Sequence, residues 1–182
     1  MTAVEELEQE AYDQNVPVDY VKFKSDHLHG LYIDGSIAIH SGLNAARTAD
    51  TLAEELEHHY TSYGNILNQH DTVCRKQEHL ARLRAYDRRV GLSGIILGYR
   101  NHCHNLHELA ECLEVSEGFL NEALECYREK YGCYTELDGY VIMFEPHLAV
   151  MEKISSIQFE RRWTISFSIM IIIKTIVPEV LI

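Results

Sequence analysis

The spacing of apolar residues divides the first 150 residues into helical and extended segments. Apolar positions recur every three or four residues in the helical segments and alternate with polar positions in the extended ones. Asp34-Gly35, between two apolar runs, is a strong signal for a two-residue hairpin turn. The pattern predicts helices over residues 3–14, 44–63, 75–90, 92–100, 106–114 and 116–131, and strands over residues 18–23, 31–33, 37–39, 140–144 and 148–150. This order of elements is that of an α+β fold.

Breaks in the pattern divide the chain into four parts. They are residues 1–90 with a short antiparallel sheet, a helical module at 91–133, a β-hairpin at 134–153, and an isoleucine-rich tail at 154–182. The uncharged run in the tail, Trp163–Ile173, is 11 residues long, whereas a membrane-spanning helix needs about 20 apolar residues. We therefore expect an extra strand or an altered terminus in the tail rather than a membrane anchor.

The formal net charge of −12 argues against a protein that coats nucleic acid or an anionic membrane. The charge is uneven, because residues 1–73 are strongly acidic and residues 74–90 are basic. The basic residues either offset neighbouring acids or grip a substrate. Five cysteines without the spacing of a disulfide framework, and an acidic N-terminus unlike a signal peptide, predict a cytoplasmic protein with free thiols.

The run LAEELEHHY on the second predicted helix has a pattern typical of metal hydrolases. Such a helix needs two ligands at positions i and i+4, and a carboxylate at i+1 that acts as general base. Glu54 and His58 have the first relation, and Glu55 takes the place of the base. Glutamate and histidine both ligate zinc. The alternative interpretation of this run is a solvated acidic helix face.

An open zinc site needs a third protein ligand. Glu78 shares a face of the next predicted helix with Ala81 and Ala85, and two alanines let that face approach its neighbour closely. We therefore expect Glu78 to face His58.

His59 is an alternative metal ligand to His58. Its partner at i−4 is Glu55, and that choice leaves Leu56 in the place of the base, so His58 is preferred. The candidates for stabilising an oxyanion are Tyr60, Tyr63 and His70.

Three motifs in order, GLYIDGSIAI, LAEELEHHYTSYGNI and RKQEHLAR, resemble the ImmA/IrrE family of metallo-endopeptidases from phages and mobile elements. The resemblance covers roughly residues 1–150. It implies that residues 1–90 are a zinc-peptidase domain and that a helix-turn-helix-like segment follows. It also implies that Glu54, His58 and Glu78 bind the metal, zinc or alternatively manganese, and that Glu55 is the catalytic base.

The resemblance implies a protein substrate as well, because known members of the family cleave a partner transcriptional repressor. The chain departs from the family pattern at Glu54, where histidine is frequent, and at Glu57, where glycine is usual. An acid at position 57 is expected to crowd the site or compete for the metal. The alternative function is therefore a catalytically inactive protein of the same fold that binds the repressor without cutting it.

Residues 106–131 have the two-helix spacing of a helix-turn-helix. A DNA-reading helix normally offers basic or amide side chains, whereas this one has four glutamates against Arg128 and Lys130. We expect a packing or protein-docking module without direct nucleic-acid binding. A nearby cluster matches no established zinc spacing and is interpreted as a polar linker: His102, Cys103, His104 and His107.

Overall fold

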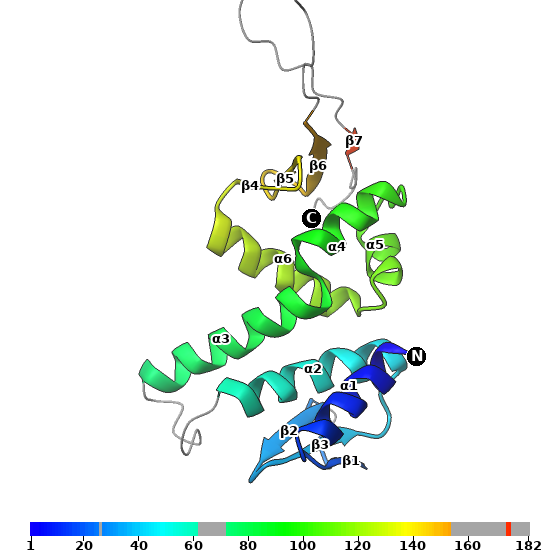
Figure 1. Cartoon of the computed structure of the whole chain (residues 1–182), viewed down its shortest axis with the longest axis vertical. Coiled ribbons are helices and arrows are strands. Elements are labelled where there is room, and N and C mark those ends of the chain that lie inside the picture. Colours follow the sequence, from blue (N-terminus) through cyan, green and yellow to red (C-terminus); the bar gives the residue numbers. More distant parts are fainter. Residues whose placement is uncertain (26, 62–71, 154–173, 176–182) are drawn as a thin grey trace, which may run out of the picture.

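A computed structural model describes residues 1–25, 27–61, 72–153 and 174–175 of the chain. It is a mixed α+β structure, with one small sheet at each end and helices between them (Figure 1). The helices are α1 (Ala3–Asp13), α2 (Ala45–Thr61), α3 (Thr72–Arg89), α4 (Gly91–Arg100), α5 (Leu106–Cys112) and α6 (Glu117–Tyr131). The strands are β1 (Val18–Val21), β2 (Gly30–Ile33), β3 (Ser36–His40), β4 (Tyr134–Leu137), β5 (Tyr140–Met143), β6 (Ala149–Glu152) and β7 (Lys174–Thr175).

The N-terminal sheet has the order β1-β3-β2, with α2 packed against β2 and β3. The predicted hairpin of β2 and β3 is confirmed, and both turn residues, Asp34 and Gly35, have the positive φ that a type I′ turn requires. Ile37 and Ile39 of β3 are fully buried. The sequence pattern did not predict that β1 joins this sheet parallel to β3. Strand β2 therefore lies at the edge of the sheet and next to α2.

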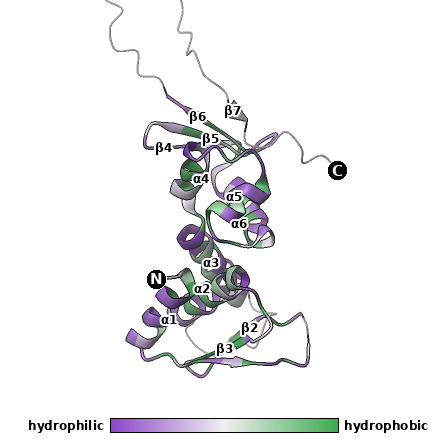
Figure 2. Cartoon of the chain, turned by 90° about the vertical axis from the view of Figure 1, so that its right-hand side faces the viewer, coloured by the Kyte–Doolittle hydropathy of each residue, from purple (hydrophilic) through white to green (hydrophobic). Residues whose placement is uncertain are grey.

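Helices α2 and α3 pack along each other between the two ends of the molecule (Figure 2). Leu52 and Leu56 of α2 are fully buried, as are Ala81 and Ala85 of α3. The small side chains on α3 allow the close approach that was expected from the sequence. Helix α3 begins three residues before the predicted start, and the predicted last turn of α2 at residues 62–63 lies outside the described residues.

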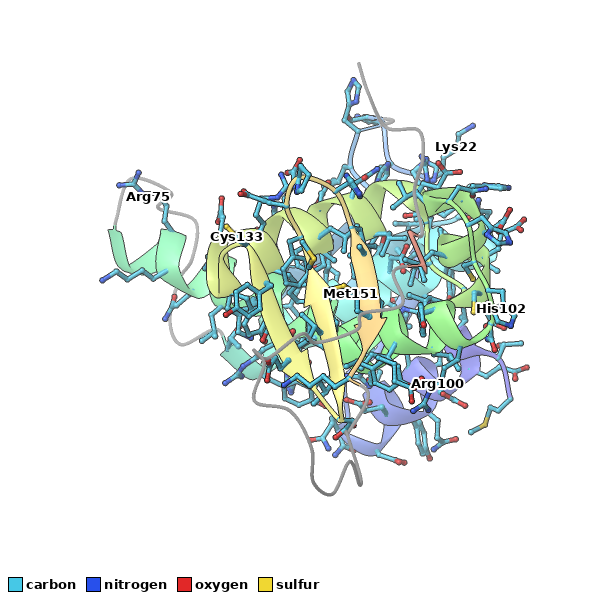
Figure 3. The ribbon with its side chains drawn as sticks, turned by 90° about the horizontal axis from the view of Figure 1, so that it is seen from above. Lys22, Arg75, Arg100, His102, Cys133 and Met151 are labelled. Atoms are coloured by element: carbon cyan, nitrogen blue, oxygen red, sulfur yellow. The ribbon has the colours of Figure 1, made fainter. Side chains whose placement is uncertain are left out.

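The second end of the molecule combines α4, α5 and α6 with a meander of β4, β5 and β6. Figure 3 looks at the molecule from the side of this sheet, with Arg100 at the end of α4 and Cys133 just after α6. The predicted N-cap at Ser116 is confirmed, since its hydroxyl accepts from the Phe119 N–H at 3.3 Å. The predicted C-terminal hairpin corresponds to β5 and β6, but the prediction missed β4, which pairs with β5 as a further strand.

The tail is described only at β7, where Lys174 and Thr175 pair with β6. This pairing agrees with the expected extra strand at these two residues, and the rest of that prediction lies outside the described part of the chain. Among the described residues, no helix has both the length and the apolar character needed to cross a membrane.

A buried ion pair connects the N-terminal half of the molecule to the helical module. Asp50 of α2 is only 4% exposed, and its carboxylate lies 3.4 Å from Arg89 Nε at the end of α3. Its second oxygen accepts from the backbone N–H of Ser116 at 2.8 Å, and Arg89 also donates to the Glu114 carbonyl. Burial raises the pKa of Asp50, and the Ser116 and Arg89 contacts oppose that rise. This cluster fixes the start of α6 against α2.

We predict that Arg89→Met lowers the free energy of unfolding by about 3 kcal/mol, because it leaves the Asp50 carboxylate buried without its partner. Arg84→Met, at an exposed position of the same helix, should change the free energy by less than about 0.5 kcal/mol. Urea denaturation measures both values. Adding Asp50→Asn to Arg89→Met should recover part of the loss, and a loss below about 1 kcal/mol for Arg89→Met would contradict the role of the pair.

Candidate functional site

The structure brings together two of the three predicted metal ligands, one from α2 and one from α3. Nε2 of His58 lies 3.5 Å from Oε2 of Glu78. Burial lowers the pKa of His58, and the neighbouring Glu78 carboxylate opposes this effect. The lowered pKa favours the neutral imidazole, which is the form that ligates a metal.

Arg82 supplies a positive charge beside this pair. Its Nε donates to the other carboxylate oxygen of Glu78 at 2.9 Å, one turn along α3. The Arg82 side chain is 53% exposed, so this pair is largely accessible to water. Glu78 thus has one oxygen next to His58 and the other on Arg82.

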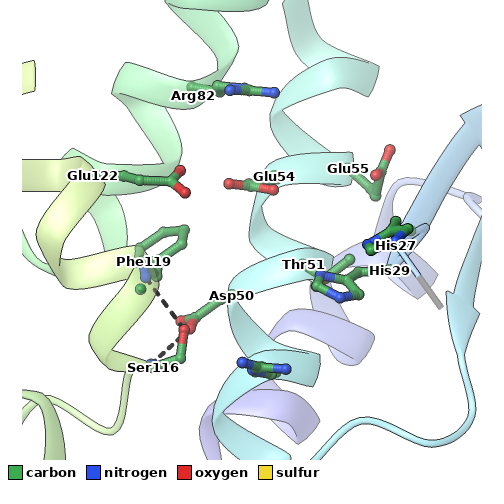
Figure 4. Close-up of a pocket in the computed structure, with 13 residues that line it drawn as sticks. His27, His29, Asp50, Thr51, Glu54, Glu55, Arg82, Ser116, Phe119 and Glu122 are labelled. Atoms are coloured by element: carbon green, nitrogen blue, oxygen red, sulfur yellow. Dashed lines mark hydrogen bonds between the residues drawn. The ribbon is translucent and has the colours of Figure 1, made fainter.

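Glu54 points from α2 across a cleft toward Glu122 of α6 (Figure 4). Burial raises the pKa of Glu54 to about 7, and Glu122, Asp50 and Glu78 add to the rise, whereas Arg82 opposes it. Glu122 accepts from the Tyr86 hydroxyl at 2.8 Å. The negative charge of these carboxylates is therefore only partly compensated by the cations of the chain.

Glu55 lies on the side of α2 that faces β2. Burial raises its pKa to about 8, Glu54 adds to the rise, and the backbone N–H of Tyr32 opposes it. Gly30 contacts the Glu55 side chain directly, because the strand has no side chain at that position. A carboxylate with a pKa near neutrality is well suited to accept and return a proton at physiological pH.

The donor chemistry fits a divalent cation, although the third ligand does not converge. Within the described ranges, no group of three or more His, Cys, Asp or Glu side chains is arranged to hold a metal ion. His58 and Glu78 form a two-residue pair, and Glu54 turns toward Glu122 instead (Figure 4). The raised pKa values of Glu54 and Glu55 reflect their burial and, in addition, the neighbouring carboxylates, and a divalent cation would offset both effects.

The position of the Glu57 side chain does not match the expectation that it crowds this site or competes for the metal. Its carboxylate lies 3.8 Å from Nη1 of Arg88, and Arg88 is also bound to both carboxylate oxygens of Glu10 on α1. Burial raises the pKa of Glu57, and Arg88 and Arg84 oppose the rise. The side chain is therefore directed to α1 and to the second half of α3, and the arginine accommodates its charge.

The neighbouring side chains His59 and Tyr60 contact different elements, β2 and α1. Nδ1 of His59 lies 2.9 Å from the Tyr32 hydroxyl, so His59 is on the flank of the site, as the preference for His58 implies. The Tyr60 hydroxyl donates to Glu10 at 2.9 Å, so this oxyanion candidate is engaged with α1. The other two candidates, Tyr63 and His70, lie outside the described residues.

The candidate base and one candidate ligand line a cleft of about 520 Å³ between α2, the start of β2 and α6. The sequence pattern did not predict its far wall, because residues 106–131 were interpreted as a packing or protein-docking module apart from the site. A signal that could have indicated the near wall is the pair His27 and His29 in front of the GLYIDG motif. The lining residues that the sequence pattern did not predict include His27, His29, Arg47, Ser116, Phe119 and Glu122.

Some of the basic residues of α3 offset acids, which was one of the two expectations for them. Arg88 pairs with Glu10, and Arg89 pairs with Asp50. Arg82 differs from these two because it also lines the cleft. It is the basic residue of α3 that remains in a position to contact a substrate there.

Comparisons with known proteins add no family to this description. No protein-family model matches the chain, and no curated protein matches it. The interpretation of the site therefore depends on the geometry and chemistry of its own residues.

We predict that the metal-free protein loses stability as the pH rises, in contrast to ordinary acid denaturation. Folding raises the pKa of Glu54 and Glu55 from 4.5 to about 7 and about 8, so it favours their protonated forms. This contribution is complete below about pH 4.5 and is lost as the pH rises through 7 and 8. We expect a loss of roughly 2 kcal/mol for each carboxyl, after allowing for partial exposure.

Urea denaturation between pH 5 and pH 9, with a chelator present, measures this loss. The Glu54→Gln/Glu55→Gln variant should remove most of the pH dependence, while Glu129→Gln, an exposed position on α6, should leave it unchanged. A wild-type protein whose stability is flat over this range would contradict the assigned burial of the two carboxylates.

Proposed function

We propose that the protein is a zinc-dependent metallo-endopeptidase of the ImmA/IrrE type, with manganese as the alternative metal. The observation that carries the proposal is the contact of His58 with Glu78 across α2 and α3, one helical turn from Glu54 and beside the candidate base Glu55. Glu54, His58 and Glu78 would hold the metal once Glu54 turns from Glu122 toward His58.

The roles of the residues follow from their surroundings. When bound, zinc supplies Lewis acidity, which makes a water molecule more acidic and polarises the scissile carbonyl. Glu55 accepts the proton of that water on a carboxylate oxygen and returns it to the leaving amine. Glu55 packs against β2 at Gly30, where no side chain displaces its carboxylate. His58 stays neutral through burial, which leaves its nitrogen lone pair available for the metal.

The substrate that we propose is a transcriptional repressor with a helix-turn-helix, cleaved in the cytoplasm to derepress a phage or mobile element. The cleft has room for a peptide segment, since its volume lies in the range of typical ligand sites. The acidic character of the chain and of α6 favours a protein partner over nucleic acid.

The arrangement of Glu57 favours the active enzyme over the inactive repressor-binding alternative. A carboxylate that competed for the metal would give a reason to expect lost activity. Glu57 is instead paired with Arg88, on the side of α2 that faces α1. The alternative then predicts binding of the repressor without cleavage, which the same experiment detects.

The experiment incubates the purified protein with the helix-turn-helix repressor encoded beside its gene, with zinc or manganese added, and follows cleavage by mass spectrometry. We expect one cut in the repressor, lost with a chelator and reduced at least 100-fold by Glu55→Gln, because a general base contributes about that much. Glu57→Gln is the matched control, since it changes a neighbouring carboxylate of the same helix and should keep the activity.

Two outcomes would count against the proposal. Tight binding of the repressor without any cut in either metal would favour the inactive alternative. Equal cleavage by the wild type and by Glu55→Gln would show that another residue is the base.

A further inference from the structure

Strand β2 makes an unusually close contact with the helix that carries the candidate base. A Cβ atom added at Gly30 would lie 2.7 Å from Oε1 of Glu55 and 2.9 Å from its Cγ. It would also lie 2.4 Å from the Cγ2 methyl of Thr51, one turn earlier on α2. These distances are too short for real carbon contacts, so only glycine fits at this position without a shift.

The same strand faces a further side chain of α2. The Tyr32 hydroxyl lies 2.9 Å from Nδ1 of His59, one turn after Glu55. Gly30 and Tyr32 are two residues apart, so they present to the same side of the strand. The Glu55 side chain therefore fills the space beside Gly30, and the nearby backbone N–H of Tyr32 opposes the rise in the pKa of Glu55.

We propose that Gly30 is a positioning residue for Glu55, because its missing side chain leaves the space that the Glu55 carboxylate occupies against strand β2. The inference rests on the proposed function only for the role of Glu55 as base. The φ of Gly30 lies outside the left-handed region, so alanine is compatible with the backbone there. The constraint at this position is the contact with α2.

The two side chains that the added methyl group would meet, Thr51 and Glu55, differ in flexibility. This difference makes the inference testable. Thr51 is β-branched and buried within a helix, so its methyl group cannot move without a cost in stability. Glu55 is a flexible side chain whose carboxylate can swing away. Gly30→Ala should therefore reduce stability through Thr51 and displace the base through Glu55. Thr51→Ser removes the first contact and leaves the second.

The experiment compares Gly30→Ala/Thr51→Ser with the wild type, with Thr51→Ser alone, and with Gly94→Ala. Gly94 lies on α4 outside the cleft, and an added Cβ there meets only the flexible Leu113 side chain, at 3.1 Å, so it controls for a glycine-to-alanine exchange as such. We expect the double variant to keep the melting temperature, the zinc Kd and the KM of Thr51→Ser. Its kcat for repressor cleavage should fall 10-fold to 100-fold, whereas Gly94→Ala should keep the wild-type kcat.

A second readout does not depend on activity. The amide resonance of Tyr32 in a ¹⁵N spectrum should shift in the double variant in the same direction as in Glu55→Ala, and should stay in place in Gly94→Ala. A folded double variant with a wild-type kcat, or an unmoved Tyr32 amide, would overturn the inference. A wild-type protein that cuts no repressor while the Tyr32 amide moves as expected would refute the proposed function and leave the contact of Gly30 with Glu55 standing.

Discussion

The buried pair of Asp50 and Arg89 is the constraint on which the rest of the structure depends. A carboxylate taken out of water is costly unless a charge and hydrogen bonds compensate it, and both are present here in Arg89 and the Ser116 N–H. Because these partners come from the end of α3 and the turn before α6, the pair fixes α6 against α2. The connection therefore links the two helices that form opposite walls of the cleft.

The helical period of α2 explains how one short run of polar residues contacts neighbouring elements on three sides of the helix. Successive residues are rotated by 100°, so residues three or four apart share a side. Glu54 and His58 face α3 and α6, whereas Glu55 and His59 face β2. Tyr60 binds Glu10 of α1 directly, and Glu57 lies beside Arg88, which also binds Glu10. The run is therefore neither a uniform metal site nor a solvated acidic face. Each pair of side chains has its own partner, and burial raises the pKa of Glu54 to about 7 and that of Glu55 to about 8.

Local signals in the sequence predicted most of the elements, and non-local pairing accounts for what they did not predict. Asp34-Gly35 predicted its hairpin, and the same dipeptide at Asp138-Gly139, with the same positive φ values, marks the turn between β4 and β5 that the pattern left unassigned. The parallel pairing of β1 with β3 has no local signature. For the site, Ala81 and Ala85 indicated which face of α3 meets α2. The positions of Arg88 and Glu122 depend on tertiary packing, so spacing alone could not show that Glu57 is neutralised or that Glu54 turns toward α6.

The central claim is that Glu54, His58 and Glu78 bind one metal ion together. X-ray absorption spectroscopy of the protein loaded with one equivalent of zinc tests it most directly, because it counts the imidazole, carboxylate and thiolate ligands of the ion. We predict a single imidazole and carboxylate oxygens at about 2.0–2.2 Å, with the imidazole signal lost in His58→Ala. Two imidazoles, a sulfur ligand, or an unchanged spectrum in His58→Ala would contradict it.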